Sequence, residues 1–222
     1  MSKKSPVETT PETFILESLT IENEENQEFD GKLLYETLKL QGKNPKYFYF
    51  RTKPEFKKLI DMFHSSGYRY LHLSCHGSEA RIDTTLDRIS FDELSELVRN
   101  KLKNRRLFIS GCYTGNKLLC EKVSDSNKGI FSIIAPTQKL FFNQTIPFWS
   151  SFYYLMDADS ETGGMKKARI EFVLKHLTQT FNLKLAYYYH DTCNQEFVYK
   201  VFEPDYDNFS DLGISAPKEI LD

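Results

Sequence analysis

Two short apolar segments of this chain each end in a reactive side chain beside a glycine. The first is Tyr70-Leu-His-Leu-Ser-Cys-His-Gly77, and the second is Leu107-Phe-Ile-Ser-Gly-Cys-Tyr-Thr-Gly115. An apolar run that stops at a glycine turn is typical of a buried strand meeting a loop. A thiol becomes a strong nucleophile when it loses its proton, and a nearby histidine can accept that proton. We therefore interpret His76 as a general base and Cys112 as a nucleophile.

The two segments must lie side by side for this chemistry to work. Parallel strands bring their carboxyl ends to one edge of a sheet, where ligands of open α/β proteins bind. At that edge, the backbone amides of Gly77 and Cys112 are candidates for holding an oxyanion during acyl transfer. A helix expected to begin between Thr114 and Lys117 would favour the thiolate, because its amino end carries partial positive charge.

Strands alternate with amphipathic helices along most of the sequence. The helix after Pro54 is the clearest, because its apolar residues fall at i, i+3, i+4 and i+7. The pattern predicts a mainly parallel sheet covered by helices on both faces and ending in a hairpin. The expected strands are 14–19, 47–50, 70–77, 107–112, 130–135, 185–190 and 197–202, with a small hairpin over 78–90. The expected helices are 31–40, 54–66, 90–102, 119–123, 147–156 and 165–181.

The composition indicates one folded domain. Of 222 residues, 40% are hydrophobic and 14% aromatic, enough for a core, and the net charge of −2 gives no basic footprint for nucleic acid. We expect a disordered tail over 1–12, the folded domain over 13–204 and a polar tail over 205–222. The four cysteines lack the spacing of a disulfide scaffold. The sequence also has no secretory signal and no apolar run long enough to cross a membrane. These features predict a cytoplasmic protein. The sequence contains no phosphate loop and no dinucleotide-binding fingerprint, so no cofactor is expected.

The two glycine-ended segments also carry a family resemblance. His76-Gly77 after an apolar strand, followed by Ile109-Ser-Gly-Cys-Tyr-Thr-Gly115, resembles the caspase-like cysteine peptidases, and within them the CHAT branch. The similarity extends over about residues 68–180. Three features depart from the family pattern, and one is the loop Pro136-Thr-Gln-Lys-Leu-Phe-Phe-Asn143, where the family usually has a tryptophan. The caspase signature Gln-Ala-Cys-x-Gly is absent, and Tyr113 stands where an acidic residue is common.

The resemblance implies a three-layer α/β sandwich that acts as a cysteine endopeptidase on a specific protein. His76 and Cys112 would form the dyad, the amides of Gly77 and Cys112 the oxyanion site, and Pro136, Thr137 and Gln138 part of the substrate pocket. The chemistry needs no metal or cofactor. It further implies control by an activating or inhibitory protein partner and, as in prokaryotic relatives, a role in anti-phage defence. Direct contact with nucleic acid or membrane is not expected.

Two other functions use the same residues. The domain could be a catalytically idle binding or scaffold module, or a different thiol enzyme such as an acyltransferase or amidase. A zinc site built from Cys75, His76, Cys112 and Cys120 lacks the close ligand pairs of structural zinc. Strand alternation turns Cys75 away from His76, so we interpret Cys75, Cys120 and His72 as structural. His176 and His190 are expected in solvated or capping positions.

Overall fold

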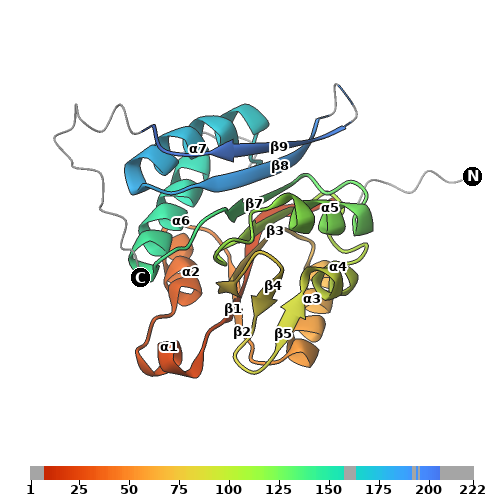
Figure 1. The fold of residues 1–222 in the computed structure, drawn as a ribbon, viewed down its shortest axis with the longest axis vertical. Coiled ribbons are helices and arrows are strands. Elements are labelled where there is room, and N and C mark those ends of the chain that lie inside the picture. Colours follow the sequence, from red (N-terminus) through yellow and green to blue (C-terminus); the bar gives the residue numbers. More distant parts are fainter. Residues whose placement is uncertain (1–7, 158–163, 192–193, 195, 206–222) are drawn as a thin grey trace, which may run out of the picture.

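A twisted sheet forms the middle of the molecule (Figure 1). The computed structural model describes residues 8–157, 164–191, 194 and 196–205. Residues 1–7 and 206–222 of the predicted tails (1–12 and 205–222), and Cys193, lie outside these residues. The main strands are β1 (Thr10–Ser18), β2 (Lys46–Tyr49), β3 (Tyr68–Gly77), β6 (Arg106–Ile109), β7 (Ser132–Pro136), β8 (Leu185–Asp191) and β9 (Glu196–Phe202). Their order is β2-β1-β3-β6-β7-β8-β9. The first five are parallel, and β8 and β9 form the antiparallel hairpin at the end.

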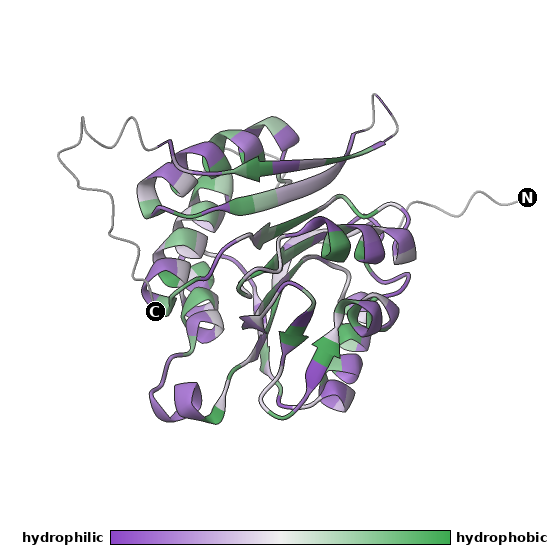
Figure 2. Ribbon diagram, viewed as in Figure 1, coloured by the Kyte–Doolittle hydropathy of each residue, from purple (hydrophilic) through white to green (hydrophobic). Residues whose placement is uncertain are grey.

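Helices cover both faces of the sheet. One face carries α3 (Lys53–Ser66), α4 (Phe91–Leu97) and α5 (Lys117–Ser126), and the other carries α2 (Asp30–Leu40), α6 (Phe142–Asp157) and α7 (Lys167–Phe181). Strand β3 shows why both are needed, since Leu71 and Leu73 enter one core cluster and Tyr70 enters the other. Hydrophobic residues gather along the central strands, and hydrophilic ones on the outer helical surfaces (Figure 2). The predicted fold class is confirmed.

A small antiparallel ladder extends the carboxyl end of β3. Strands β4 (Arg81–Asp83) and β5 (Arg88–Ser90) pair with each other, and β4 pairs with His76 and Gly77. This is the hairpin predicted over residues 78–90. Ser90 then caps α4, because its hydroxyl accepts from the Glu93 amide while the Glu93 carboxylate accepts from the Ser90 amide. The ladder fixes the backbone on which His76 stands.

Several element boundaries differ from the sequence prediction, and α4, for example, ends at Leu97 rather than at Leu102. Strand β1 starts at Thr10 rather than Phe14, because its first residues pair with β3 and the Thr10 amide donates to the Gly67 carbonyl. Between the strand predicted over 14–19 and the helix predicted over 31–40 the structure adds a short helix, α1 (Ile21–Glu25), capped by Thr20. Helix α6 starts at Phe142, five residues before Pro147, which we had placed at its first turn.

The early start of α6 has a local cause. The Phe141 amide donates to the side-chain oxygen of Gln144 at 3.3 Å, and the Thr145 amide donates to the Phe141 carbonyl at 3.0 Å. These bonds form the first turn of the helix, which therefore begins before Pro147. As a consequence, Phe142 and Thr145 stand at the carboxyl edge of the sheet.

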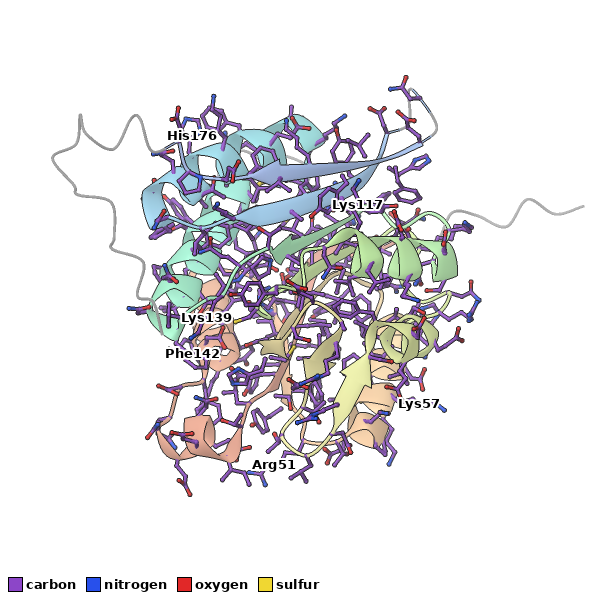
Figure 3. All side chains as sticks on the ribbon, viewed as in Figure 1. Arg51, Lys57, Lys117, Lys139, Phe142 and His176 are labelled. Atoms are coloured by element: carbon purple, nitrogen blue, oxygen red, sulfur yellow. The ribbon has the colours of Figure 1, made fainter. Side chains whose placement is uncertain are left out.

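Helix α7 carries His176, for which the sequence predicts a solvated or capping position. His176 lies on the outer side of α7 (Figure 3), where its Nδ1 atom is 2.8 Å from the Phe172 carbonyl and its ring contacts the Phe172 ring. Its exposed position agrees with the expected solvated role.

Among the helices in the described ranges, none is at once long and apolar enough to cross a bilayer.

Candidate active site

The loop after β6 presents Cys112 at the carboxyl edge of the sheet. The Ser110 amide donates to the Leu73 carbonyl at 2.8 Å, which continues the β3–β6 pairing past the last residue of the strand. Tyr113 then adopts a left-handed conformation with φ of 58°, and the chain turns. Asn116 caps α5 by accepting from its backbone, so the helix begins at Lys117 as predicted. Cys112 is half-buried between these two anchors.

The carboxyl end of β7 holds this loop through backbone contacts. The Gly115 amide donates to the Pro136 carbonyl at 2.7 Å, and the Tyr113 amide donates to the Gln138 carbonyl at 3.1 Å. A Cβ atom on Gly115 would lie 2.2 Å from the Ala135 carbonyl oxygen, so only glycine fits there. The segment predicted to bind substrate therefore positions the nucleophile loop from behind.

His76 is held by a residue that the sequence analysis did not select. Its Nε2 atom lies 2.6 Å from the Asn23 amide oxygen, in α1. The Asn23 amide nitrogen faces Glu28, which fixes the amide with its oxygen toward the imidazole. An amide oxygen can only accept, so Nε2 of a neutral His76 carries the proton and Nδ1 keeps a free lone pair. That is the tautomer a general base requires.

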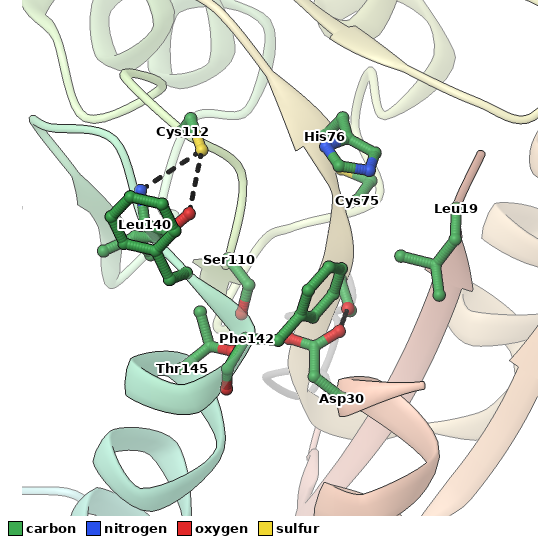
Figure 4. A pocket seen from close by; sticks show the side chains of 11 residues that line it. Leu19, Asp30, Cys75, His76, Ser110, Cys112, Leu140, Phe142 and Thr145 are labelled. Atoms are coloured by element: carbon green, nitrogen blue, oxygen red, sulfur yellow. Dashed lines mark hydrogen bonds between the residues drawn. The ribbon is translucent and has the colours of Figure 1, made fainter. Parts of the chain in front are cut away.

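His76 and Cys112 line the same pocket (Figure 4), which has about 340 Å³ of free space that includes its open side. The two side chains come from neighbouring strands and stand at the same end of the pocket. Its remaining lining comes from β1, α2, β3, the loop after β6 and the start of α6, and consists of Leu19, Asp30, Ser74, Cys75, Ser110, Leu140, Phe141, Phe142 and Thr145.

The thiol of Cys112 is engaged by the backbone of Leu140. Its sulfur accepts from the Leu140 amide at 3.3 Å and lies 3.7 Å from the Leu140 carbonyl oxygen (Figure 4). In the described structure no hydrogen bond joins this thiol to the imidazole of His76. The pair shares a pocket without forming the bonded dyad that catalysis needs.

The substrate residues predicted from the sequence stay a prediction. Pro136, Thr137 and Gln138 do not line the pocket beside the thiol. Thr137 borders a separate depression with Tyr113, and its amide donates to the Lys184 carbonyl. The pocket wall comes instead from Leu140 to Phe142, a few residues farther along the same loop, because α6 begins earlier than its proline suggested.

The Gly77 amide faces the nucleophile loop. On the β6 side of β3, the Leu73 carbonyl accepts from Ser110, whereas the Ser78 amide donates to Arg81 in β4 on the opposite side. Backbone polar groups of alternate residues face the same neighbour, so the Gly77 N–H points to the β6 side with Leu73. A Cβ atom on Gly77 would also lie 3.0 Å from the Cys112 carbonyl oxygen, which shows how close the two loops are.

A buried pair of carboxyl groups lies at the far end of the pocket. Asp30 lines the pocket and accepts a short hydrogen bond from the Ser74 hydroxyl. Glu17 is completely buried beside it and accepts from the Gly31 amide and the Tyr47 hydroxyl, both at 2.7 Å. Burial raises the pKa of Glu17 to about 8, and the charge of Asp30 adds to that effect; burial also raises the pKa of Asp30. Glu17 therefore keeps its proton at neutral pH.

A second buried network fixes Ser110 in the pocket wall. His72 lies with its Nε2 atom 3.0 Å from the Ser110 hydroxyl and its Nδ1 atom 3.2 Å from the Tyr153 hydroxyl. Burial lowers the pKa of His72 to about 3, so the ring is neutral. His72 is therefore a structural residue, as expected.

The other described cysteines are poor nucleophiles. Cys75 and Cys120 are both buried, and burial raises the pKa of each thiol, to about 12 for Cys120. Cys75 packs in the core on the side of β3 opposite His72 and also borders the pocket. Within the described ranges, no group of three or more His, Cys, Asp or Glu side chains is arranged to hold a metal ion.

Three functional neighbours escaped the sequence analysis. Asn23 lies 53 positions before His76 in the polar segment that forms α1, and no local pattern marks it. The sequence does contain a signal for Glu17 and for its need of a partner such as Asp30. Glu17 interrupts an apolar strand in Phe14-Ile-Leu-Glu-Ser-Leu19, and a charge inside a buried strand requires a partner.

Comparisons with known proteins identify no family for this chain. No protein-family model matches it, and no curated protein matches it. Among solved structures it is similar to iotapain, a secreted C11 cysteine protease from Bacteroides thetaiotaomicron, with 11% sequence identity and a TM-score of 0.48 over 82% of this chain and 67% of that one. A likeness of this degree carries no information about activity or substrate.

Proposed function

We propose that this protein is a cysteine endopeptidase in which Cys112 attacks a peptide carbonyl with His76 as its base. One observation carries the proposal. A histidine and a cysteine from two neighbouring strands, 36 positions apart in the sequence, line one pocket at the carboxyl edge of the sheet. The free Nδ1 lone pair of His76 supports the assignment, as does the orientation of the Gly77 amide.

The proposed reaction proceeds through an acyl-enzyme. Nδ1 of His76 accepts the thiol proton as the Cys112 sulfur attacks the carbonyl carbon, and the Gly77 and Cys112 amides stabilise the negative oxygen. The protonated imidazole then gives its proton to the departing amine as the C–N bond breaks. Water, deprotonated by the same ring, attacks the thioester and regenerates the thiol. Asn23 holds the Nε2 proton throughout and so keeps the ring in one orientation.

We further propose that a protein partner controls the site. The contacts of Cys112 with Leu140 support this, because the thiol must leave them before it can approach His76. A partner that displaces residues 137–141 would free the thiol and widen the pocket together. An antiviral role and a cytoplasmic location belong to the same proposal and rest on the resemblance of the motifs alone.

The test is to identify which proteins are cut in a lysate of the native host, because the lysate supplies both substrate and activator. Mass spectrometry should find new peptide ends with the unaltered protein and none with Cys112→Ala or His76→Ala. Cys120→Ala is the matched control and should cut the same sites. A set of peptide ends that is identical for the unaltered protein and Cys112→Ala would refute the peptidase and favour the idle binding module.

A further inference from the structure

A separate depression lies at the amino edge of the sheet, opposite the proposed dyad. Its wall contains Arg69, the second residue of β3, and Arg106, the first residue of β6. His76 and Cys112 stand at or beyond the other ends of the same two strands. Arg69 and His76 are seven positions apart in β3, which places the two sites about 23 Å from each other. The depression has about 510 Å³ of free space that includes its open side, a size that suits a small ligand.

The described lining of this depression is positively charged. It contains three cationic side chains and no acidic one, and consists of Arg69, Arg106, Phe131, Gly164, Met165 and Lys166. Within the described ranges, none of the three cations forms an ion pair with a carboxylate, although the neighbouring Lys167 pairs with Asp191 at 3.2 Å. The whole chain has a net charge of −2, so its overall composition does not account for this cluster. Three cations without a counter-charge attract an anion.

Neutral groups hold the two arginines in place. Arg106 donates to the Ser132 hydroxyl at 2.7 Å and to the Met165 carbonyl at 2.6 Å. Arg69 donates from Nε to the Thr9 hydroxyl at 2.9 Å and from Nη2 to the Thr9 carbonyl. Burial lowers the pKa of Arg106, and the nearby charge of Arg69 acts in the same direction. The ordinary pKa of a guanidinium is so high that both remain charged. Their acceptors therefore fix them without neutralising them.

The amino end of α7 adds a further attraction for an anion. Lys166 precedes the first turn of this helix, and a lysine side chain has no acceptor with which to cap it. No acidic residue occupies that first turn. The amino end of a helix carries partial positive charge and N–H groups that bind phosphate oxygens. Because Met165 and Lys166 both line the depression, the helix end and the cations act on the same space.

Phe131 gives the depression an aromatic surface. It is 40% exposed, and the Arg106 guanidinium lies 5.4 Å from the centre of its ring. An exposed aromatic ring stacks on the flat face of any nucleic-acid base. Guanidinium groups beside it supply the charged donors that phosphate oxygens prefer.

We propose that this depression binds a nucleotide, with its phosphate groups on Arg69, Lys166 and the amino end of α7 and its base against Phe131. Arg106 adds a fixed charge beside the ring. No local motif marks the site in the sequence, because its residues come from β3, β6 and the start of α7. The inference is independent of the peptidase proposal, since the two sites use different residues at opposite edges of the sheet.

Calorimetric titration of the full chain tests the site without requiring turnover, and ATP serves as the probe because stacking accepts any base. We expect ATP to bind at least about tenfold more tightly than adenosine, which lacks the phosphates, and than tripolyphosphate, which lacks the base. Arg69→Gln and Lys166→Gln should each weaken ATP binding about tenfold. Phe131→Ala should weaken the binding of ATP and leave that of tripolyphosphate unchanged. Lys175→Gln is the matched control, because it removes an exposed charge farther along α7, and it should bind ATP as the unaltered protein does.

Several results would overturn the inference. The absence of ATP binding at concentrations up to about 1 mM would remove the site. ATP binding that both Arg69→Gln and Lys166→Gln leave unchanged would place the nucleotide elsewhere, and Lys166 is exposed, so its variant should fold even if Arg69→Gln does not. Equal affinities for ATP and tripolyphosphate would contradict the nucleotide. None of these results bears on the peptidase proposal, because the measurement involves no cleavage.

Discussion

Replacing Glu17 with glutamine should change how the stability of this protein depends on pH. Burial, with the charge of Asp30 added, raises the pKa of Glu17 from 4.5 to about 8 in the folded state. The folded chain therefore binds this proton more tightly than the unfolded chain does. The proton contributes stability that is fully present below pH 4.5 and is lost as the pH rises to 8. Glutamine cannot titrate, so Glu17→Gln should remove most of this dependence.

The magnitude follows from the shift. One pH unit between the two pKa values changes the free energy of unfolding by about 1.4 kcal/mol, so three units, from pH 5 to pH 8, give up to about 4 kcal/mol. At pH 5 the variant should be less stable by about 1–3 kcal/mol, because its amide nitrogen must face one of the donors that now bind Glu17. At pH 8 the order should reverse, since the variant has no second buried charge beside Asp30.

Urea unfolding curves at pH 5, 6, 7 and 8 measure this difference directly. Glu36→Gln is the matched control, because it removes an exposed carboxyl from the same helix, α2. Its unfolding free energy should follow that of the unaltered protein across the series. A difference between Glu17→Gln and the unaltered protein that stays constant within about 0.5 kcal/mol from pH 5 to pH 8 would refute the buried proton on Glu17.

Three further substitutions test the architecture of the site. Asn23→Ala should lower kcat about 10-fold or more by freeing the imidazole, with a stability change of about 1 kcal/mol; an unchanged kcat would mean that the amide does not orient His76. Gly115→Ala should cost about 1–3 kcal/mol in thermal unfolding and most of the activity, because its Cβ meets the Ala135 carbonyl at 2.2 Å; a stable, active variant would contradict that contact. Cys112→Ala should abolish cleavage while changing stability by less than about 2 kcal/mol, and a larger loss in denaturant unfolding would assign Cys112 to the core.

Local patterns were sufficient to predict most of the elements. The apolar face of α3, the capping box of α4 and the two strands that end in glycine all follow from spacing within a few residues. The shared position of His76 and Cys112 follows from those strands being parallel neighbours, which the alternation of strands and helices implies. Information of this kind is contained in short windows of sequence.

The features that the sequence analysis missed depend on contacts between distant residues. Asn23 meets His76 only because α1 folds back over the end of β3, and the buried pair of Glu17 and Asp30 exists only because β1 and the start of α2 lie side by side. The wall of the pocket was not predicted for a different reason. Pro147 has the appearance of a helix start, and the bond between Phe141 and Gln144 that begins α6 earlier involves ordinary residues.

The central claim is that His76 activates Cys112, and a peptide that carries an electrophile in place of its scissile bond tests it most directly. The labelled site is mapped by mass spectrometry after reaction in host lysate, for the unaltered protein and for His76→Ala. We expect the label on Cys112 alone among Cys75, Cys112 and Cys120, forming about 100-fold or more slowly in His76→Ala. Labelling of Cys112 at the same rate in both proteins, or labelling of a different cysteine, would contradict the account.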